Sequence, residues 1–250
     1  MSFIIKKIEK GIATLTFNRG KVNAINEDFV DQLDQALKAL EHDGDVRAII
    51  LTGQGKFFSF GFDIPEFLSR PRDDFRRFLS KFTALYAYMF LYPKPLIAAI
   101  NGHAIAGGCM LTNCCDFRIM VSGKAKISLN ELGLGASVFA GSVDILKYRI
   151  GGGKAQEVLF SAAMYSAEQA AGLGLVEQVV SEAELYEVAG SKAQEYAGKD
   201  MAAFASIKRL LRKPVVDGFK EREAEANEEF LDIWYSESTW RNLLQVKIRE

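Results

Sequence analysis

The sequence predicts an α/β protein with a helical C-terminal region. Short unbroken apolar runs alternate with amphipathic helical stretches, and almost everything after Gly141 has helical periodicity. Such alternation is typical of βαβ units with right-handed crossovers. The length of 250 residues lies within the range of one large domain. We therefore expect an α/β core over residues 1–195 and a helical region over residues 196–250.

The N-terminal segment predicts a hairpin followed by a helix. Residues 12–17 alternate along the chain after a turn at Gly11, which is typical of the second strand of a hairpin. Asn26 is expected to cap a helix, because an acidic first turn and apolar residues at helical spacing follow it. These apolar residues are Phe29, Leu33, Leu37 and Leu40.

The middle of the chain predicts buried parallel strands. Residues 48–51 and 96–100 are unbroken apolar runs, and the stretch between them over residues 73–90 is helical in pattern. Parallel strands covered on both faces have this continuous apolar character. Residues 117–121 and 175–180 are candidates for further strands.

The C-terminal region is expected to consist of separate helices. Periodic apolar residues occur over residues 182–197, 201–212 and 220–249, and Gly198, Pro214 and Gly218 are expected to break the pattern. The last segment carries more apolar side chains than a small lobe readily buries, so we expect a homotrimer or a dimer of trimers. These side chains are Phe230, Ile233, Trp234, Trp240, Leu243, Leu244 and Ile248.

Composition narrows the classes of function. A hydrophobic fraction of 49%, a charged fraction of 25% and a net charge of −1 describe a globular protein, and argue against nucleic acid as the main partner. Three clustered cysteines, Cys109, Cys114 and Cys115, favour a reducing compartment. No apolar run approaches the roughly 20 residues that span a bilayer, and residues 1–11 lack a signal-peptide core. We expect a soluble cytoplasmic protein that does not associate with membranes.

Two glycine-containing turns follow the carboxyl ends of predicted strands. Residues 57–63 follow the strand that begins at Ala48, and residues 101–109 follow the strand that begins at Leu96. Ligands bind at this edge of open α/β sheets, and glycine lets the backbone approach a ligand closely. Taken singly, each turn is better explained as a tight strand-to-helix connection that binds nothing.

The same turns resemble motifs of the crotonase (enoyl-CoA hydratase/isomerase) family. Phe58-Ser59-Phe60-Gly61-Phe62-Asp63 is similar to its Phe-Ser-Ala-Gly-x-Asp loop, with phenylalanine in place of alanine. The segment from Ala99 to Gly107-Gly108-Cys109 resembles its glycine-rich turn, with Ala106 at the first glycine. Residues 116–119, 129–135 and 167–176 resemble further motifs in the family's order, so the likeness runs over about residues 3–180.

The resemblance implies a ββα superhelix core, a helical trimerisation region and an acyl-CoA thioester as substrate. It implies that the backbone N–H groups of Phe62 and Gly107 hold the thioester oxygen, and that the adenosine part lies near residues 22–25 and 58–64. No metal and no further cofactor are expected. The expected substrate-binding residues are Val22, Ala24, Ser59, Phe60, Gly61, Asp63, Ile64, Gly108, Met110 and Phe139.

Glu131 matches a catalytic carboxylate of the family and is expected to take a proton from C2 of the acyl chain. The second carboxylate of hydratases is replaced by Met110. One base suffices to move a proton between C2 and C4, whereas hydration is usually handled by two. Asn130 and the apolar segment over residues 136–139 also resemble mitochondrial-type 3,2-enoyl-CoA isomerases. We therefore expect an isomerase; a hydratase or other lyase, or a non-catalytic acyl-CoA-binding protein, are the alternatives.

Four other features have competing interpretations. His103 is either a general base or a packed histidine, and Cys109 is either a nucleophile or a small buried residue. Residues 151–154 suggest a phosphate loop but lack the following Ser or Thr, which favours a turn between helices. Asp144 is either a second acid near the acyl chain or a solvated helix carboxylate. With His42 and His103 as the two histidines, a metal site is not expected.

Overall fold

The computed structural model describes residues 2–246. Two sheets of mostly parallel strands form the centre of the fold. Every neighbouring pair of strands is parallel except β1 and β2, which are antiparallel. The larger sheet contains, in spatial order, β1 (Ile4–Glu9), β2 (Ile12–Phe17), β3 (Ala48–Gly53), β5 (Leu96–Ile100), β7 (Phe117–Val121) and β9 (Gln178–Val180). The smaller sheet contains β4 (Phe57–Ser59), β6 (His103–Ile105) and β8 (Ile127–Ser128).

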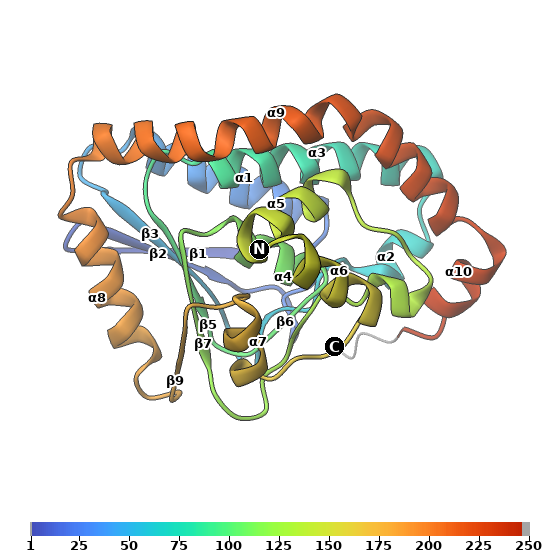
Figure 1. Cartoon of the computed structure of the whole chain (residues 1–250), viewed down its shortest axis with the longest axis horizontal. Coiled ribbons are helices and arrows are strands. Elements are labelled where there is room, and N and C mark those ends of the chain that lie inside the picture. Colours follow the sequence, from blue (N-terminus) through green and yellow to red (C-terminus); the bar gives the residue numbers. More distant parts are fainter. Residues whose placement is uncertain (1, 247–250) are drawn as a thin grey trace.

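Helices cover these sheets and extend beyond them. Figure 1 shows α9 crossing the molecule beside α3, with α8 at one side of the larger sheet. The helices are α1 (Glu27–His42), α2 (Ile64–Leu68), α3 (Arg72–Leu91), α4 (Gly107–Cys114), α5 (Ala140–Ile150), α6 (Gly152–Ser161), α7 (Ala167–Leu173), α8 (Leu185–Ala197), α9 (Met201–Trp234) and α10 (Glu237–Leu243), with a 3-10 helix η1 (Glu131–Leu134). Within residues 2–246, none of them combines the length and apolar character that a membrane crossing needs.

The N-terminal and central elements confirm the sequence predictions. β1 and β2 form the expected hairpin, and the side chain of Asn26 accepts a hydrogen bond from the Phe29 N–H at 3.0 Å to cap α1. The predicted strands around α3 are β3 and β5, and both are completely buried. The strand expected over residues 175–180 is shorter, since β9 begins at Gln178 after the end of α7.

The prediction of breaks at Pro214 and Gly218 was wrong, because α9 is one helix from Met201 to Trp234. Proline in a helix interior removes one backbone hydrogen bond and usually costs about 3 kcal/mol. Packing against α3 and α5 offsets this cost, since α9 buries Val216 and Phe219 on its inner side. The break at Gly198 is confirmed as the end of α8. Residues 247–249 of the last predicted helix lie outside the described residues.

Close backbone contacts between β4 and β6 bring the two glycine turns together. A Cβ atom on Gly108 would lie 2.3 Å from the carbonyl oxygen of Ser59, so no larger residue fits there without a shift. Gly61 has φ +91°, and a Cβ atom on it would lie 3.0 Å from the Gly107 nitrogen. Glycine at both positions therefore lets the first turn of α4 lie against the loop that follows β4.

A buried ionic cluster anchors the far end of α4. Asp116 forms ion pairs with Lys208 and Arg212 of α9, both at 2.7 Å, and accepts a hydrogen bond from the Leu96 N–H at 2.8 Å. Arg212 also donates to the carbonyl oxygen of Cys114 at 3.3 Å, at the C-terminus of α4. Cations stabilise this end of a helix, because its last carbonyl groups have no partner inside the helix.

Replacement of Asp116 by asparagine is therefore expected to destabilise the protein strongly. The change leaves Lys208 and Arg212 buried without a counter-charge, which typically costs about 3–5 kcal/mol. Urea unfolding measures this loss. The matched control is Asp217→Asn on α9, whose exposed pair with Lys213 contributes at most about 1 kcal/mol. Equal effects of the two substitutions would contradict the structural role of the cluster.

Candidate active site

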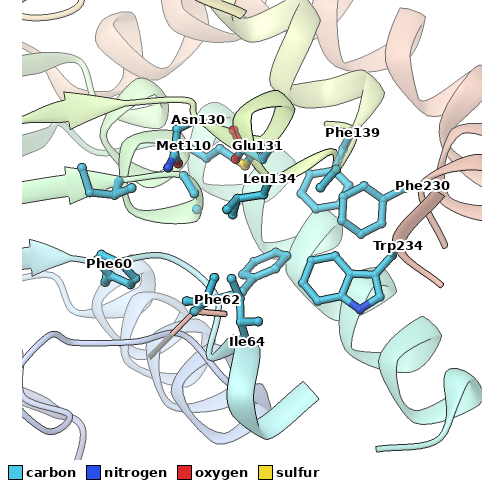
Figure 2. Close-up of a pocket in the computed structure, with 15 residues that line it drawn as sticks. Phe60, Phe62, Ile64, Met110, Asn130, Glu131, Leu134, Phe139, Phe230 and Trp234 are labelled. Atoms are coloured by element: carbon cyan, nitrogen blue, oxygen red, sulfur yellow. The ribbon is translucent and has the colours of Figure 1, made fainter. Parts of the chain in front are cut away.

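An apolar cavity of about 110 Å³ lies between the glycine turns, η1 and the C-terminal part of α9. Figure 2 shows Phe60 at one end of the cavity and Trp234 at the other, with Glu131 and Met110 between them. The residues that line it are Phe60, Phe62, Ile64, Ile105, Ala106, Gly107, Met110, Asn130, Glu131, Leu134, Ala136, Phe139, Phe230, Trp234 and Val246.

Two backbone N–H groups at the cavity wall are free to bind a ligand. Gly107 is the first residue of α4, so its N–H has no partner within the helix. On either side of Phe62, the Gly61 carbonyl accepts from the Ile25 N–H and the Asp63 N–H donates to the Ile25 carbonyl. Neither the Phe62 N–H nor the Gly107 N–H donates a hydrogen bond within the described part of the chain.

The preceding residue, Ala106, turns the chain sharply into α4. Its backbone has φ 50° and ψ −119°, a conformation that residues with a Cβ atom rarely adopt. Its N–H donates to the Ser128 carbonyl at 2.8 Å, and its own carbonyl accepts from the Met110 N–H. These two hydrogen bonds hold the strained residue in place, at the point where a backbone donor meets the cavity.

Glu131 places a buried carboxylate in the cavity wall. The residue begins η1 and is 9% exposed, and its Oε2 atom has no hydrogen-bond partner within the described residues. Burial raises the pKa of Glu131 to about 7, because the charged form loses its hydration. The side chain therefore exchanges a proton readily near neutral pH, as a catalytic base must.

Met110 lies one turn into α4 and lines the cavity beside Glu131 (Figure 2). Its thioether neither carries a proton nor orients a water molecule as a carboxylate does. Among residues 2–246, Glu131 is the one carboxylate that lines the cavity. The arrangement therefore supplies a single base beside two backbone donors.

The structure gathers about half of the predicted site residues around the cavity. Seven of them line it: Phe60, Phe62, Ile64, Gly107, Met110, Glu131 and Phe139. The other six, Val22, Ala24, Ser59, Gly61, Asp63 and Gly108, lie outside its wall. Contact of any of the thirteen with a substrate stays a prediction.

The residues outside the wall hold the loops that form it. The Phe60 N–H donates to the Val22 carbonyl at 2.9 Å, and the Ser59 hydroxyl donates to the Asn23 carbonyl at 2.7 Å. Asp63 caps α2 and forms an ion pair with Arg19 at 2.7 Å. These contacts connect the loop before α1 to the loop after β4.

Sequence reasoning missed the part of the wall that α9 supplies. Phe230 and Trp234 were predicted to be available for subunit contacts, but both are 3% exposed and line the cavity of their own chain. Leu243 is also fully buried within the chain. The i, i+4 spacing of Phe230 and Trp234 indicated a shared helix face, but nothing in it indicated what that face covers.

The other candidates lie away from the cavity. The His103 ring packs on Phe57 at a centroid distance of 4.9 Å, its Nδ1 accepts from the Lys126 N–H, and burial followed by the charge of Lys126 lowers its pKa. Cys109 is buried, which raises the pKa of its thiol to about 12. Asp144 forms ion pairs with Arg222 and Lys147.

The glycine-rich segment that suggested a phosphate loop lies at a junction between two helices. Gly151 alone separates α5 from α6, and residues 152–154 begin α6, so the segment connects two helices as expected. No cluster of three or more potential metal-ligating side chains occurs among residues 2–246.

The fold and the site define an α/β protein in which two backbone N–H groups lie beside a buried carboxylate at one cavity. Residues 7–242 match the sequence pattern of the Enoyl-CoA hydratase/isomerase family. The chain belongs to this family, and family members act on acyl-CoA thioesters.

Some relatives that resemble the chain are named hydratases, and others are named isomerases. A short-chain-enoyl-CoA hydratase from Clostridium acetobutylicum is 34% identical over 84% of this chain and 81% of its own length. The mitochondrial enoyl-CoA delta isomerase 1 of Rattus norvegicus is 31% identical over 88% of this chain and 77% of its own length. The crystal structure of human mitochondrial delta3-delta2-enoyl-CoA isomerase superimposes with a TM-score of 0.94 at 26% identity, and covers 97% of this chain and 96% of its own.

Burial of Glu131 predicts a pH-dependent loss of stability. The carboxyl is protonated in both the folded and the unfolded chain well below pH 4.5, and it is ionised in both well above pH 7. Its folded-state pKa is raised, so this group's contribution to stability is lost as pH rises between these values. The difference corresponds to about 3 kcal/mol.

The variant Glu131→Gln removes this titration and keeps the shape of the side chain. Relative to wild type, the variant is expected to become more stable as pH rises from about 5 to about 8. Urea unfolding of both proteins at the two pH values measures the change. A stability difference that is the same at both values would contradict a pKa near 7.

Proposed function

We propose that the protein is a 3,2-enoyl-CoA isomerase that uses Glu131 as its base. The observation that carries the proposal is the pairing of one buried carboxylate with Met110 in the same cavity. A single base can shuttle a proton between two carbons of one substrate. The coenzyme A thioester is the substrate, and the proposal needs no metal and no further cofactor.

The proposed reaction begins when the Glu131 carboxylate takes a proton from C2 of a 3-enoyl thioester. The C2–H electron pair forms a C1–C2 double bond, and negative charge moves to the thioester oxygen. The N–H groups of Phe62 and Gly107 are proposed to hold this dienolate oxygen, each donor contributing about 3 kcal/mol of transition-state stabilisation. Glu131 then returns the proton to C4, the oxygen charge collapses, and the double bond lies between C2 and C3.

The apolar cavity supports these proposed reaction steps in two ways. Low polarity strengthens the hydrogen bonds to the developing oxyanion and keeps water away from the dienolate. It also brings the pKa of Glu131 to about 7, so the same group can accept and then release the proton near neutral pH.

A hydratase or another lyase of the family is the second candidate. The side-chain oxygen of Asn130 favours it, although the identity of this residue resembles the isomerases. The Oδ1 atom of Asn130 is buried, lines the same cavity and has no hydrogen-bond partner within the described residues. An unpaired amide oxygen next to a carboxylate is able to hold a water molecule. Non-catalytic acyl-CoA binding is the third candidate, and the unpaired base argues against it.

The isomerase proposal predicts the activity of the wild-type protein and of Glu131→Gln. Wild type is expected to shift the double bond of 3-hexenoyl-CoA faster than it hydrates crotonyl-CoA, with kcat/KM rising to a plateau above about pH 7. The variant is expected to lose turnover by at least about a hundredfold while binding acyl-CoA within a few fold of wild type. Absorbance of the conjugated thioester measures turnover, and calorimetry measures binding.

Two results would overturn this assignment. One is faster hydration of crotonyl-CoA than isomerisation by the wild-type protein, which would favour the hydratase. The other is isomerase turnover retained by Glu131→Gln, which would remove Glu131 from the reaction.

We further propose that the protein is a cytoplasmic homotrimer or dimer of trimers. Exposed apolar side chains on the first half of α9 support self-association: Ile207, Leu210 and Leu211 are 59%, 72% and 58% exposed. Light scattering is expected to give three or six times the chain mass of 27.7 kDa. A mass of one chain at micromolar concentration would contradict the assembly.

A further inference from the structure

We propose that this active site is built for short acyl groups of four to six carbons. The inference rests on the proposed function, because it assigns the acyl chain to the cavity that holds Glu131. It comes from the closed end of the cavity, where Phe139, Phe230 and Trp234 form an aromatic wall.

The wall lies opposite Phe60, which belongs to the segment 58–64 near which the family resemblance places the adenosine part of coenzyme A, and we take this as the end at which the thioester enters. Figure 2 shows Phe60 at the entry end, Glu131 and Phe62 in the middle, and the three rings of the aromatic wall beyond them. An acyl chain whose thioester oxygen lies at the Phe62 N–H therefore extends from C2 onward toward Phe230 and Trp234. The aromatic wall closes this path, since its three residues are 2–3% exposed.

Neighbouring rings hold the aromatic wall in place. Phe230 packs between Phe139 at 4.8 Å and Trp234 at 5.7 Å, measured between ring centroids. From behind, α3 supports it, with Phe75 at 4.7 Å from Trp234 and Phe82 at 5.8 Å from Phe139. Rings packed on both sides cannot swing aside without opening a void, and an interior at native packing density resists such a change.

The size of the cavity sets the length of the acyl group. A buried apolar cavity of about 150 Å³ holds one benzene molecule, which has six carbons. The cavity here has about 110 Å³ and must hold the reacting carbons as well as the tail. In proportion, it accommodates about four non-hydrogen atoms at once, which excludes aryl groups and chains of eight or more carbons while the wall is in place.

Saturated acyl-CoA esters test this limit without any catalytic step. In an unlimited apolar channel, affinity rises about fourfold for each added methylene. Here we expect affinity to rise from butanoyl-CoA to hexanoyl-CoA and then to fall, with decanoyl-CoA at least about tenfold weaker than hexanoyl-CoA. Calorimetry with the wild-type protein measures the affinities for butanoyl-, hexanoyl-, octanoyl- and decanoyl-CoA.

A variant of the aromatic wall tests which residues impose the limit. Phe230→Leu removes one ring of the wall and is expected to strengthen decanoyl-CoA binding at least about tenfold relative to wild type. The matched control is Phe219→Leu, which removes a fully buried ring from the same helix outside the cavity. The control is expected to keep the wild-type order of affinities, and thermal unfolding establishes that both variants are folded.

The outcomes separate this inference from the proposed function. Decanoyl-CoA binding as tight as hexanoyl-CoA binding in wild type overturns the length limit and leaves the isomerase proposal standing. A shift in preference caused equally by Phe219→Leu overturns the role of the aromatic wall. Failure of every ester to bind overturns the proposed function, and the length limit with it.

Discussion

The site depends on two stretches of backbone that lie too close together for any side chain between them. A Cβ atom on Gly108 would collide with the Ser59 carbonyl, and one on Gly61 would crowd the Gly107 nitrogen. This contact exists because β4 and β6 are parallel neighbours, so the turns that follow them leave the small sheet at the same edge. It sets two unpaired N–H groups on one wall, and it fixes where α4 begins.

The remaining structure stabilises an arrangement that is unfavourable by itself. Among residues 2–246, the buried Oε2 atom of Glu131 and the N–H groups of Phe62 and Gly107 have no hydrogen-bond partner, and Ala106 has a strained backbone. Each of these features costs free energy in the ligand-free protein. Ionic contacts at the other end of α4 and the aromatic packing between α3 and α9 offset these costs. In the proposed reaction, the stable parts of the fold thus hold polar groups ready for a charge that appears only in the transition state.

Much of the fold and the chemical centre of the site could be predicted from sequence, because both rest on local patterns. The cap at Asn26, the apolar runs of β3 and β5, and the glycine turns each occupy a short stretch of chain. β4, β6 and β8 are two or three residues long, too short for periodicity to reveal. Continuation of α9 through Pro214 and the burial of Phe230 against Phe139 depend on contacts between distant segments. A single sequence does not specify such contacts.

The separate origins of the two halves of the cavity bear on how such a protein can diversify. The reacting groups come from residues 61–131, whereas Phe230 and Trp234 come from α9, about 100 positions later in the chain. Substitutions in α9 can therefore reshape the acyl pocket while the bond-making groups stay fixed. Gene duplicates of such an enzyme are free to diverge in substrate range by changing one helix, and a protein engineer can use the same route.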